Sequence, residues 1–329
     1  MKERDLIDRI VSRLPPSPPE ILHGIGDDTA LLRVRESSDL LVTTDSQREG
    51  VHFRWDWMTP EEVGYRLVVV NASDVYSKGG KPFSAFVTLA LPSGFSEATV
   101  DKLYDGILAG CLEFGAYLSG GDISRTTGGV DLTMTLLGMV PKDQFIPRNG
   151  LVHGDRIYSI GRPGFARAGY LALSRGDFSE KLSEPIATFK RPRTFPSFPS
   201  WFLKHPFLSA SMDSSDGLGQ ALSSLARSSG VSIVLDSAPD LDYLSPVANV
   251  LSVDPRKLAL EGGEDYDLVV GVSEDKAKEF ESVARDLFHD QSHDQVTYWG
   301  RVDSSGVAGA VVTDGTYDIW DWGFDHVGG

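Results

Sequence analysis

Segments typical of strands and helices alternate along the chain, and this alternation restricts the possible folds more than any other feature. In the first half we expect a strand at 39–46, a helix at 60–80, a strand at 82–92, a helix at 96–116 and a strand at 130–140. The first strand is predicted from its β-branched run, and the first helix from Thr59 as N-cap followed by Pro60 and acidic residues. A β-α-β-α-β order predicts a layered α/β domain.

The second half repeats this pattern after a charged, glycine-containing stretch at 141–155. We expect strands at 156–161, 208–213, 231–236, 296–302 and 307–313, and helices at 164–175, at 217–230 and near 274–288. A proline-rich segment, 184–206, is predicted to be a structured arm without a long regular element. The chain is therefore expected to form two α/β (layered α+β) domains, residues 1–145 and 146–329.

Charge and composition exclude several classes of protein. The 329 residues include 31 Lys and Arg but 47 Asp and Glu, a net charge of −16, which argues against binding to nucleic acid or to an anionic membrane. No signal peptide or membrane-spanning stretch is evident, so a cytoplasmic protein is expected. Cys111 is the only cysteine, which excludes an intramolecular disulfide.

Acidic residues gather beside glycines and at the ends of predicted elements. They lie in GIGDD (Asp27, Asp28), TTDS (Asp45), NASD (Asp74), GGD (Asp122), DSSDG (Asp213, Asp216) and EGGEDYD (Glu261, Glu264, Asp265, Asp267). An aspartate beside glycine usually marks a turn, and Ser215 or Asp216 could simply cap the following helix. Asp74 differs, because a carboxylate on an apolar helix requires a cation or strong donors.

If these carboxylates converge, their repulsion must be relieved by protonation or by divalent cations. Mg²⁺ suits such a group because it takes oxygen ligands from carboxylates, water and phosphate. Six aspartates, a nucleoside triphosphate and a phosphomonoester would carry a charge of roughly −12, so several Mg²⁺ ions are expected.

Common nucleotide and hydrolase motifs are absent from the sequence. It contains no GxxxxGK[ST] loop, no protein-kinase motif set and no GxSxG. GIGDDT has Thr29 where a dinucleotide loop needs its third glycine. The phosphate chemistry expected here must therefore use another type of site.

The ordered set GIGDD, TTDS, GVHF, NASD, GGD, DSSDGL and GGEDYDL resembles the thiamine-monophosphate kinases. This family belongs to the superfamily of aminoimidazole ribonucleotide synthetase and selenophosphate synthetase. The resemblance implies two α/β domains, a homodimer formed through the N-terminal domains, and ATP-dependent phosphorylation of thiamine monophosphate to thiamine diphosphate.

The resemblance also implies roles for individual residues. Magnesium ligands would be Asp28, Thr43, Thr44, Asp45, Asp74, Asp122, Asp213 and Asp216. ATP would contact Tyr104, Gly121, Asp122, Arg148 and Ser215. Thiamine monophosphate would contact His52, Glu264, Trp322 and Phe324. His52 could instead be a hydrogen-bonded structural residue, Arg148 a surface residue, and Glu264 a partner in a helix cap.

The acceptor phosphate is already an anionic nucleophile, so we expect direct in-line transfer with no catalytic residue of the Ser-His-Asp kind. Two alternatives remain: an aminoimidazole ribonucleotide synthetase-like enzyme, and an acidic metal- or nucleotide-binding protein without turnover. Selenophosphate synthesis is disfavoured because the N-terminal region lacks cysteine. In one departure from the family, Lys78 stands where an apolar residue is more common, and we expect it not to touch a proposed ligand.

Overall fold

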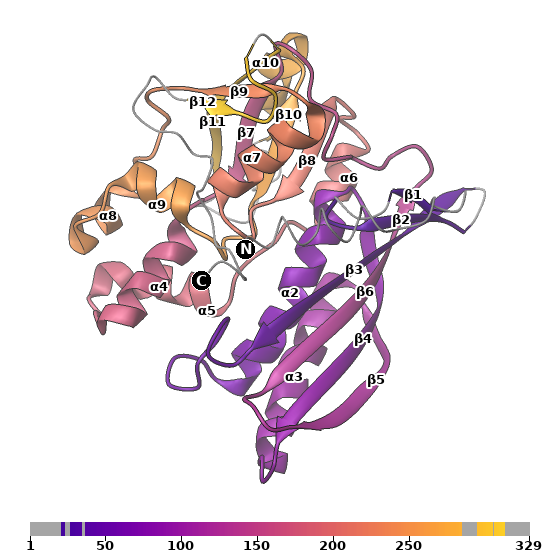
Figure 1. Cartoon of the computed structure of the whole chain (residues 1–329), viewed down its shortest axis with the longest axis vertical. Coiled ribbons are helices and arrows are strands. Elements are labelled where there is room, and N and C mark those ends of the chain that lie inside the picture. Colours follow the sequence, from indigo (N-terminus) through magenta and orange to yellow (C-terminus); the bar gives the residue numbers. More distant parts are fainter. Residues whose placement is uncertain (1–20, 24–26, 35–36, 285–294, 305, 313–329) are drawn as a thin grey trace.

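The chain is built on two six-stranded sheets, each belonging to one half of the sequence (Figure 1). The computed structural model describes residues 21–23, 27–34, 37–284, 295–304 and 306–312. Strand–helix–strand units occur in both halves, which confirms the predicted α/β class. The predicted boundary between residues 145 and 146 falls in the segment that joins the two sheets, since the first ends at Pro141 and the second begins at Arg156.

The first sheet has the strand order β1-β2-β3-β6-β4-β5. Its strands are β1 (Ile21–His23), β2 (Ala30–Arg33), β3 (Ser38–Arg48), β4 (Lys81–Pro92), β5 (Tyr117–Thr126) and β6 (Asp131–Pro141). Its helices are α2 (Pro60–Ser77) and α3 (Glu97–Phe114), and both cover the same face of the sheet (Figure 1). Neighbouring strands are antiparallel except β4 and β5, which are parallel and joined through α3.

Helix α2 is buried along almost its whole length and carries many of the residues discussed below. It begins at the predicted N-cap Thr59. The structure adds a capping box in which the Thr59 and Glu62 side chains each accept a hydrogen bond from the other's backbone N–H. Every residue from Val63 to Ser77 is buried. The helix has no solvent face because it lies between the first sheet and the elements of the second half.

Glycines allow α2 and α3 to approach closely. A Cβ atom at Gly106 of α3 would lie 2.0 Å from the carbonyl oxygen of Glu61, and one at Gly64 of α2 would lie 2.0 Å from that of Leu103. Backbone therefore packs directly against backbone at the crossing of the two helices, and no larger side chain fits there.

The second sheet has the strand order β12-β9-β11-β7-β10-β8. Its strands are β7 (Arg156–Gly161), β8 (Leu208–Asp213), β9 (Ser232–Leu235), β10 (Leu268–Val272), β11 (Gln295–Asp303) and β12 (Val311–Val312). The α-helices of this half are α4 (Phe165–Arg175), α5 (Ser183–Lys190), α6 (Phe198–Phe202), α7 (Leu218–Ser229), α8 (Ser245–Leu251), α9 (Pro255–Glu261) and α10 (Ala277–Val283). Two single 3₁₀ turns, η1 (Glu180–Leu182) and η2 (Glu274–Lys276), precede α5 and α10.

The proline-rich segment is a packed arm, as expected, with the short helices α5 and α6 as its only α-helices. Phe198, Trp201 and Phe202 of α6 belong to a hydrophobic core with Tyr158 and Phe280 of the second half. The arm is therefore held against the second domain by aromatic burial.

The sequence interpretation was wrong or incomplete at several elements. The helix expected near 274–288 is, within the described residues, only η2 and α10, and the strand expected at 307–313 is only β12. The elements not predicted are β1, β2, β5, β10, α8 and α9, together with the 3₁₀ turn η1 and the short helices α5 and α6. Among the described residues, no helix is both long enough and apolar enough to cross a membrane.

We expect Gly106→Ala to lower the free energy of unfolding by about 1–3 kcal/mol, because the new methyl group overpacks the helix crossing. Alanine normally favours a helix over glycine by about 1 kcal/mol, so any net loss measures the steric conflict. Denaturant unfolding provides the measurement. Gly128→Ala, whose added Cβ would have its nearest neighbour at 3.7 Å, is the control and should be close to neutral. An unchanged or raised stability of Gly106→Ala would contradict the proposed close packing.

Candidate functional site

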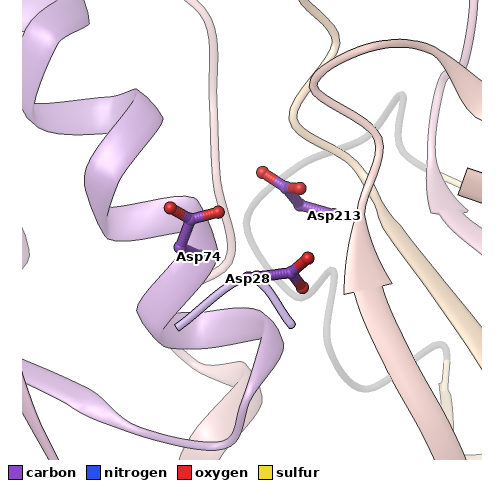
Figure 2. A group of neighbouring side chains, drawn as sticks. All are labelled: Asp28, Asp74 and Asp213. Carbon is purple, nitrogen blue, oxygen red and sulfur yellow. The ribbon is translucent and has the colours of Figure 1, made fainter. Parts of the chain in front are cut away.

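Three carboxylates from distant parts of the sequence meet between the two halves of the molecule. Asp28 lies between β1 and β2, Asp74 lies on α2, and Asp213 ends β8 (Figure 2). Each offers an oxygen atom that lies within 4.8 Å of those offered by the other two. We call these three residues the acidic cluster. Three of the predicted metal-binding aspartates are thus brought together, with ligands from both halves.

The acidic cluster is held by hydroxyl groups of neighbouring elements. Thr43 of β3 donates a hydrogen bond to Asp74 at 2.5 Å. Ser73 of α2 donates to Asp213, so that bond joins the first half to the second. Ser77 lies one turn after Ser73 and its Oγ is 3.1 Å from Asp28 Oδ2.

In the other two members of the cluster, Asp74 and Asp213, burial and charge repulsion outweigh the nearby positive charge. Burial, with the neighbouring Asp213, Asp45 and Asp28 carboxylates, raises the pKa of Asp74 well above its ordinary value. Burial and the charges of Asp28 and Asp216 likewise raise the pKa of Asp213 to about 7. Ionised carboxylates in such surroundings create a strong demand for positive charge.

Asp28 differs because two basic side chains contact it. The guanidinium of Arg148 forms an ion pair with one of its oxygens, and Lys78 Nζ lies 2.8 Å from the other. Burial opposes ionisation, but the charges of Arg148 and Lys78 hold the pKa of Asp28 below its ordinary value. Arg148 is therefore a site residue and not the exposed linker residue of the alternative interpretation, although its role toward ATP remains a prediction.

The expectation that Lys78 would not touch a proposed ligand is wrong. Its ammonium contacts both Asp27 and Asp28, each at 2.8 Å. The sequence interpretation also missed Ser73 and Ser77, and it named Asp27 among the acidic residues without giving it a role at this site. One signal was available: Lys78 follows Asp74 by four residues, the spacing that places two side chains on one face of a helix.

Ser215 and Asp216 lie beside the acidic cluster but do not cap α7. The N-cap of that helix is Gly217, and no side chain caps it. Ser215 Oγ instead donates to Asp213 Oδ1 at 3.3 Å. Asp45 and Asp216 lie close enough to affect the pKa values of Asp74 and Asp213, respectively.

Thr44 and Asp122 lie on the other face of the first sheet. Thr44 accepts a hydrogen bond from Thr135, whereas its neighbour Thr43 points to the helix side and reaches Asp74. Asp122 of β5 pairs with Thr88, and Thr88 pairs with Thr133, whose hydroxyl bonds to Ser46. Asp122 is thus three strands from β3, roughly 14 Å across the sheet. The chain does not bring these two side chains to the acidic cluster.

Gly121 has a packing role that the sequence did not reveal. A Cβ atom there would lie 1.9 Å from the carbonyl oxygen of Val87 on the adjacent strand. Tyr104, another predicted ATP contact, is half-buried on α3 and packs against the hydrophobic core between the first sheet and its two helices. Contact of either residue with ATP remains a prediction.

Glu264, a predicted substrate contact, forms an ion pair with Arg66, whose side chain is completely buried on α2. It also accepts a hydrogen bond from the hydroxyl of Tyr266. Burial opposes its ionisation, but the charge of Arg66 holds the pKa of Glu264 below its ordinary value. Glu264 and Tyr266 have φ angles of 72° and 56°, a left-handed conformation that is uncommon outside glycine and often occurs at functional sites.

The remaining predicted substrate contacts have different outcomes. His52 accepts a hydrogen bond from the Arg48 backbone N–H at 3.0 Å, which agrees with the alternative that it is a hydrogen-bonded structural residue. Its charge also acts on Glu264. Contact of His52 with thiamine monophosphate remains a prediction. Trp322 and Phe324 lie outside the described residues.

The loop that carries Glu264 is locked to the loop that carries Asp213. The Glu264 backbone N–H donates to Ser215 O at 2.7 Å, and the Ser214 N–H donates to Asp267 O at 2.9 Å. A Cβ at Gly217 would lie 2.1 Å from the carbonyl oxygen of Gly262. The DSSDG and GGEDYD motifs thus form one structural unit.

This arrangement is well suited to a hard divalent cation. The donors are all oxygen atoms, they lie within 4.8 Å of one another, and two of the carboxylates are destabilised as anions. Mg²⁺ prefers such ligands and completes its coordination with water or phosphate oxygens. Together the acidic cluster and Arg148 can accommodate a metal–phosphate complex.

Comparisons with known proteins agree with this chemistry. The family described as "AIR synthase related protein, N-terminal domain" matches residues 26–140. Thiamine-monophosphate kinase of Salmonella typhimurium is 30% identical over 328 residues, 98% of each chain, and that of Aquifex aeolicus is 34% identical over 74% of this chain and 79% of its own.

A solved structure described as "AaThiL complexed with AMPPCP and TMP" superposes with a TM-score of 0.83. It is 30% identical in sequence, and the match covers 99% of this chain and 97% of that one. The similarity therefore extends through both halves and includes the elements that carry the acidic cluster. These matches confirm the resemblance inferred from the motifs: the chain belongs to the thiamine-monophosphate kinase family.

Proposed function

We propose that this protein transfers the γ-phosphoryl group of ATP to thiamine monophosphate and so forms thiamine diphosphate. The observation that carries the proposal is the acidic cluster, which joins carboxylates of both halves beside Arg148. Its relatives over nearly the whole chain are thiamine-monophosphate kinases, and AaThiL was solved with AMPPCP, an ATP analogue, and TMP.

Magnesium is the metal proposed for this site. Asp74 and Asp213 are the first residues that would hold it, because they are the two whose ionisation is disfavoured without added positive charge. Asp28, Asp45 and Asp216 lie near enough to share further ions. When bound, Mg²⁺ supplies positive charge that reduces repulsion between the two substrates and orients their phosphates.

The residues of the chain bind and orient the reactants and need not accept a proton. The acceptor phosphate is already an anion, so a general base is dispensable and direct in-line transfer is proposed. Arg148, which pairs with Asp28, would balance phosphate charge. The Ser215 hydroxyl would donate to a phosphate oxygen in place of its present bond to Asp213. Glu264, kept anionic by Arg66, would attract the cationic thiazolium ring.

We also propose that the protein is a homodimer formed through the first sheet. Both helices of this half lie on one face of the sheet, and none of the described helices covers the opposite face, called here the bare face (Figure 1). Phe86, on the bare face in the same row as Thr135, is 41% exposed, while Leu137 and Met139 on that face are half-buried. A second copy of the sheet would bury this apolar surface.

Replacement of Asp213 by asparagine is expected to lower kcat by about 100-fold or more, equivalent to roughly 3 kcal/mol of lost transition-state stabilisation. Formation of thiamine diphosphate from ATP and thiamine monophosphate with Mg²⁺ is the assay. Because ionised Asp213 is disfavoured in the metal-free protein, the Tm of D213N in EDTA should be unchanged or higher.

Asp275→Asn, at an exposed position remote in the sequence from the cluster, is the matched control and should retain full activity. Wild-type turnover of folded D213N would contradict the proposed metal site. If the wild-type protein binds ATP with Mg²⁺ but forms no thiamine diphosphate, the proposed reaction is wrong. An assay with the aminoimidazole ribonucleotide synthetase substrate and ATP would then distinguish the related synthetase from a binding protein.

Phe86→Glu is expected to convert the dimer to a monomer in sedimentation experiments, because it places a charge in the proposed sheet-to-sheet interface. Phe178→Glu is the control, since Phe178 is an exposed aromatic residue of the second half, 72% accessible. The interface would be assigned wrongly if Phe86→Glu remained dimeric, or if both variants dissociated.

A further inference from the structure

Lys78 is a completely buried lysine at a site proposed to bind metal ions. An ammonium group has three N–H donors, and Nζ of Lys78 has three oxygen partners: Asp27 Oδ1 and Asp28 Oδ2, each at 2.8 Å, and the carbonyl oxygen of Ser211. Its side chain has no exposure to solvent. A buried charge of this kind persists only when it is paired, and here every donor is satisfied.

The backbone of Lys78 is also fixed. It is the C-cap residue of α2, its N–H donates to Tyr76 O, and its carbonyl accepts a hydrogen bond from Ile146 at 3.3 Å. The side chain starts from a rigid helix end and reaches Ser211 of β8 in the other half. Lys78 is therefore a built-in part of the junction between the halves.

The charges around Lys78 can be counted from the contacts. Asp27, Asp28, Asp74 and Asp213 contribute four negative charges when ionised, and Lys78 and Arg148 contribute two positive charges. These groups alone leave a charge of −2, which one divalent cation would balance, and the nearby Asp45 and Asp216 add further negative charge. Without Lys78 the same group would carry −3, and Asp28 would lose one of its two cations.

We propose that Lys78 is a resident counter-ion of the metal–phosphate site. It occupies the Asp27–Asp28 side of the acidic cluster permanently and supplies positive charge that a divalent ion would otherwise provide. Exchangeable Mg²⁺ is thereby directed to Asp74 and Asp213, which do not pair directly with Lys78, although its charge reaches Asp213. The inference rests on the proposed function, because it assumes that this cluster binds Mg²⁺.

Lys78→Met tests this role, with thermal unfolding of the full chain in EDTA and across an Mg²⁺ titration, and with calorimetric Mg²⁺ binding in the absence of ATP. Wild-type protein should be folded in EDTA and gain little in Tm from Mg²⁺. The variant should have a lower Tm in EDTA, recover most of it with Mg²⁺, and bind Mg²⁺ about tenfold more tightly because one nearby positive charge is gone.

Two further variants separate charge from packing. Lys78→Arg keeps the charge and should keep the weak Mg²⁺ dependence of the wild type. Lys278→Met removes a lysine from an exposed position on α10, away from the acidic cluster and the proposed dimer interface, and should leave both measurements unchanged. If Lys78→Met does not fold in EDTA, Lys78→Gln, which retains two N–H donors without the charge, is measured in the same way.

The results that would overturn the role of Lys78 differ from the result that would overturn the metal site. Equal Mg²⁺ responses of wild-type and Lys78→Met proteins, or a loss of stability in the variant that saturating Mg²⁺ does not reduce, would show that Lys78 is only a packing residue. If wild-type protein bound no Mg²⁺ with or without ATP, the proposed metal site itself would be wrong and this inference with it.

Discussion

Buried negative charge at the junction of the two halves is the constraint on which the site depends. Asp28 and Asp74 come from the first half and Asp213 from the second, so the repulsion among them acts across the junction. The opposing contacts cross the same junction: Ser73 bonds to Asp213, and Arg148 pairs with Asp28. The two halves are therefore joined by a polar network whose stability depends on its charge balance.

Helix α2 carries residues at both ends of the proposed active site. Its Arg66 contacts Glu264, and Asp74, eight residues later, lies in the acidic cluster. Eight residues of α-helix span about 12 Å. Because the helix is buried and capped, this separation is fixed by the fold. A substrate with a phosphate at one end and a cationic ring at the other fits such an arrangement.

Much of this structure could be predicted from local sequence. The strand 39–46 and the helix 60–80 correspond to β3 and α2, and Thr59 was recognisable as the N-cap from residue types alone. The aspartates of the cluster were found because their positions beside glycines and on an apolar helix are unusual. These features depend on neighbours in the chain, which is why the sequence reveals them.

Other features could not be predicted because they depend on contacts between distant segments, and one was missed although strand geometry predicts it. Strand β5 has almost no buried residue, so hydrophobic periodicity could not reveal it. Arg66 and Glu264 meet only in the folded chain. The opposite directions of Thr43 and Thr44 could have been predicted, because successive side chains of a strand alternate between faces.

The interlocked DSSDG and GGEDYD loops limit how the site can move. Backbone hydrogen bonds connect Ser215 to Glu264 and Ser214 to Asp267, and glycines bring the two loops into direct contact. A displacement of Asp213 must therefore carry Glu264 with it. Within the second half, the spacing between Asp213 on the metal side and Glu264 on the proposed ring side is therefore preserved however the site moves.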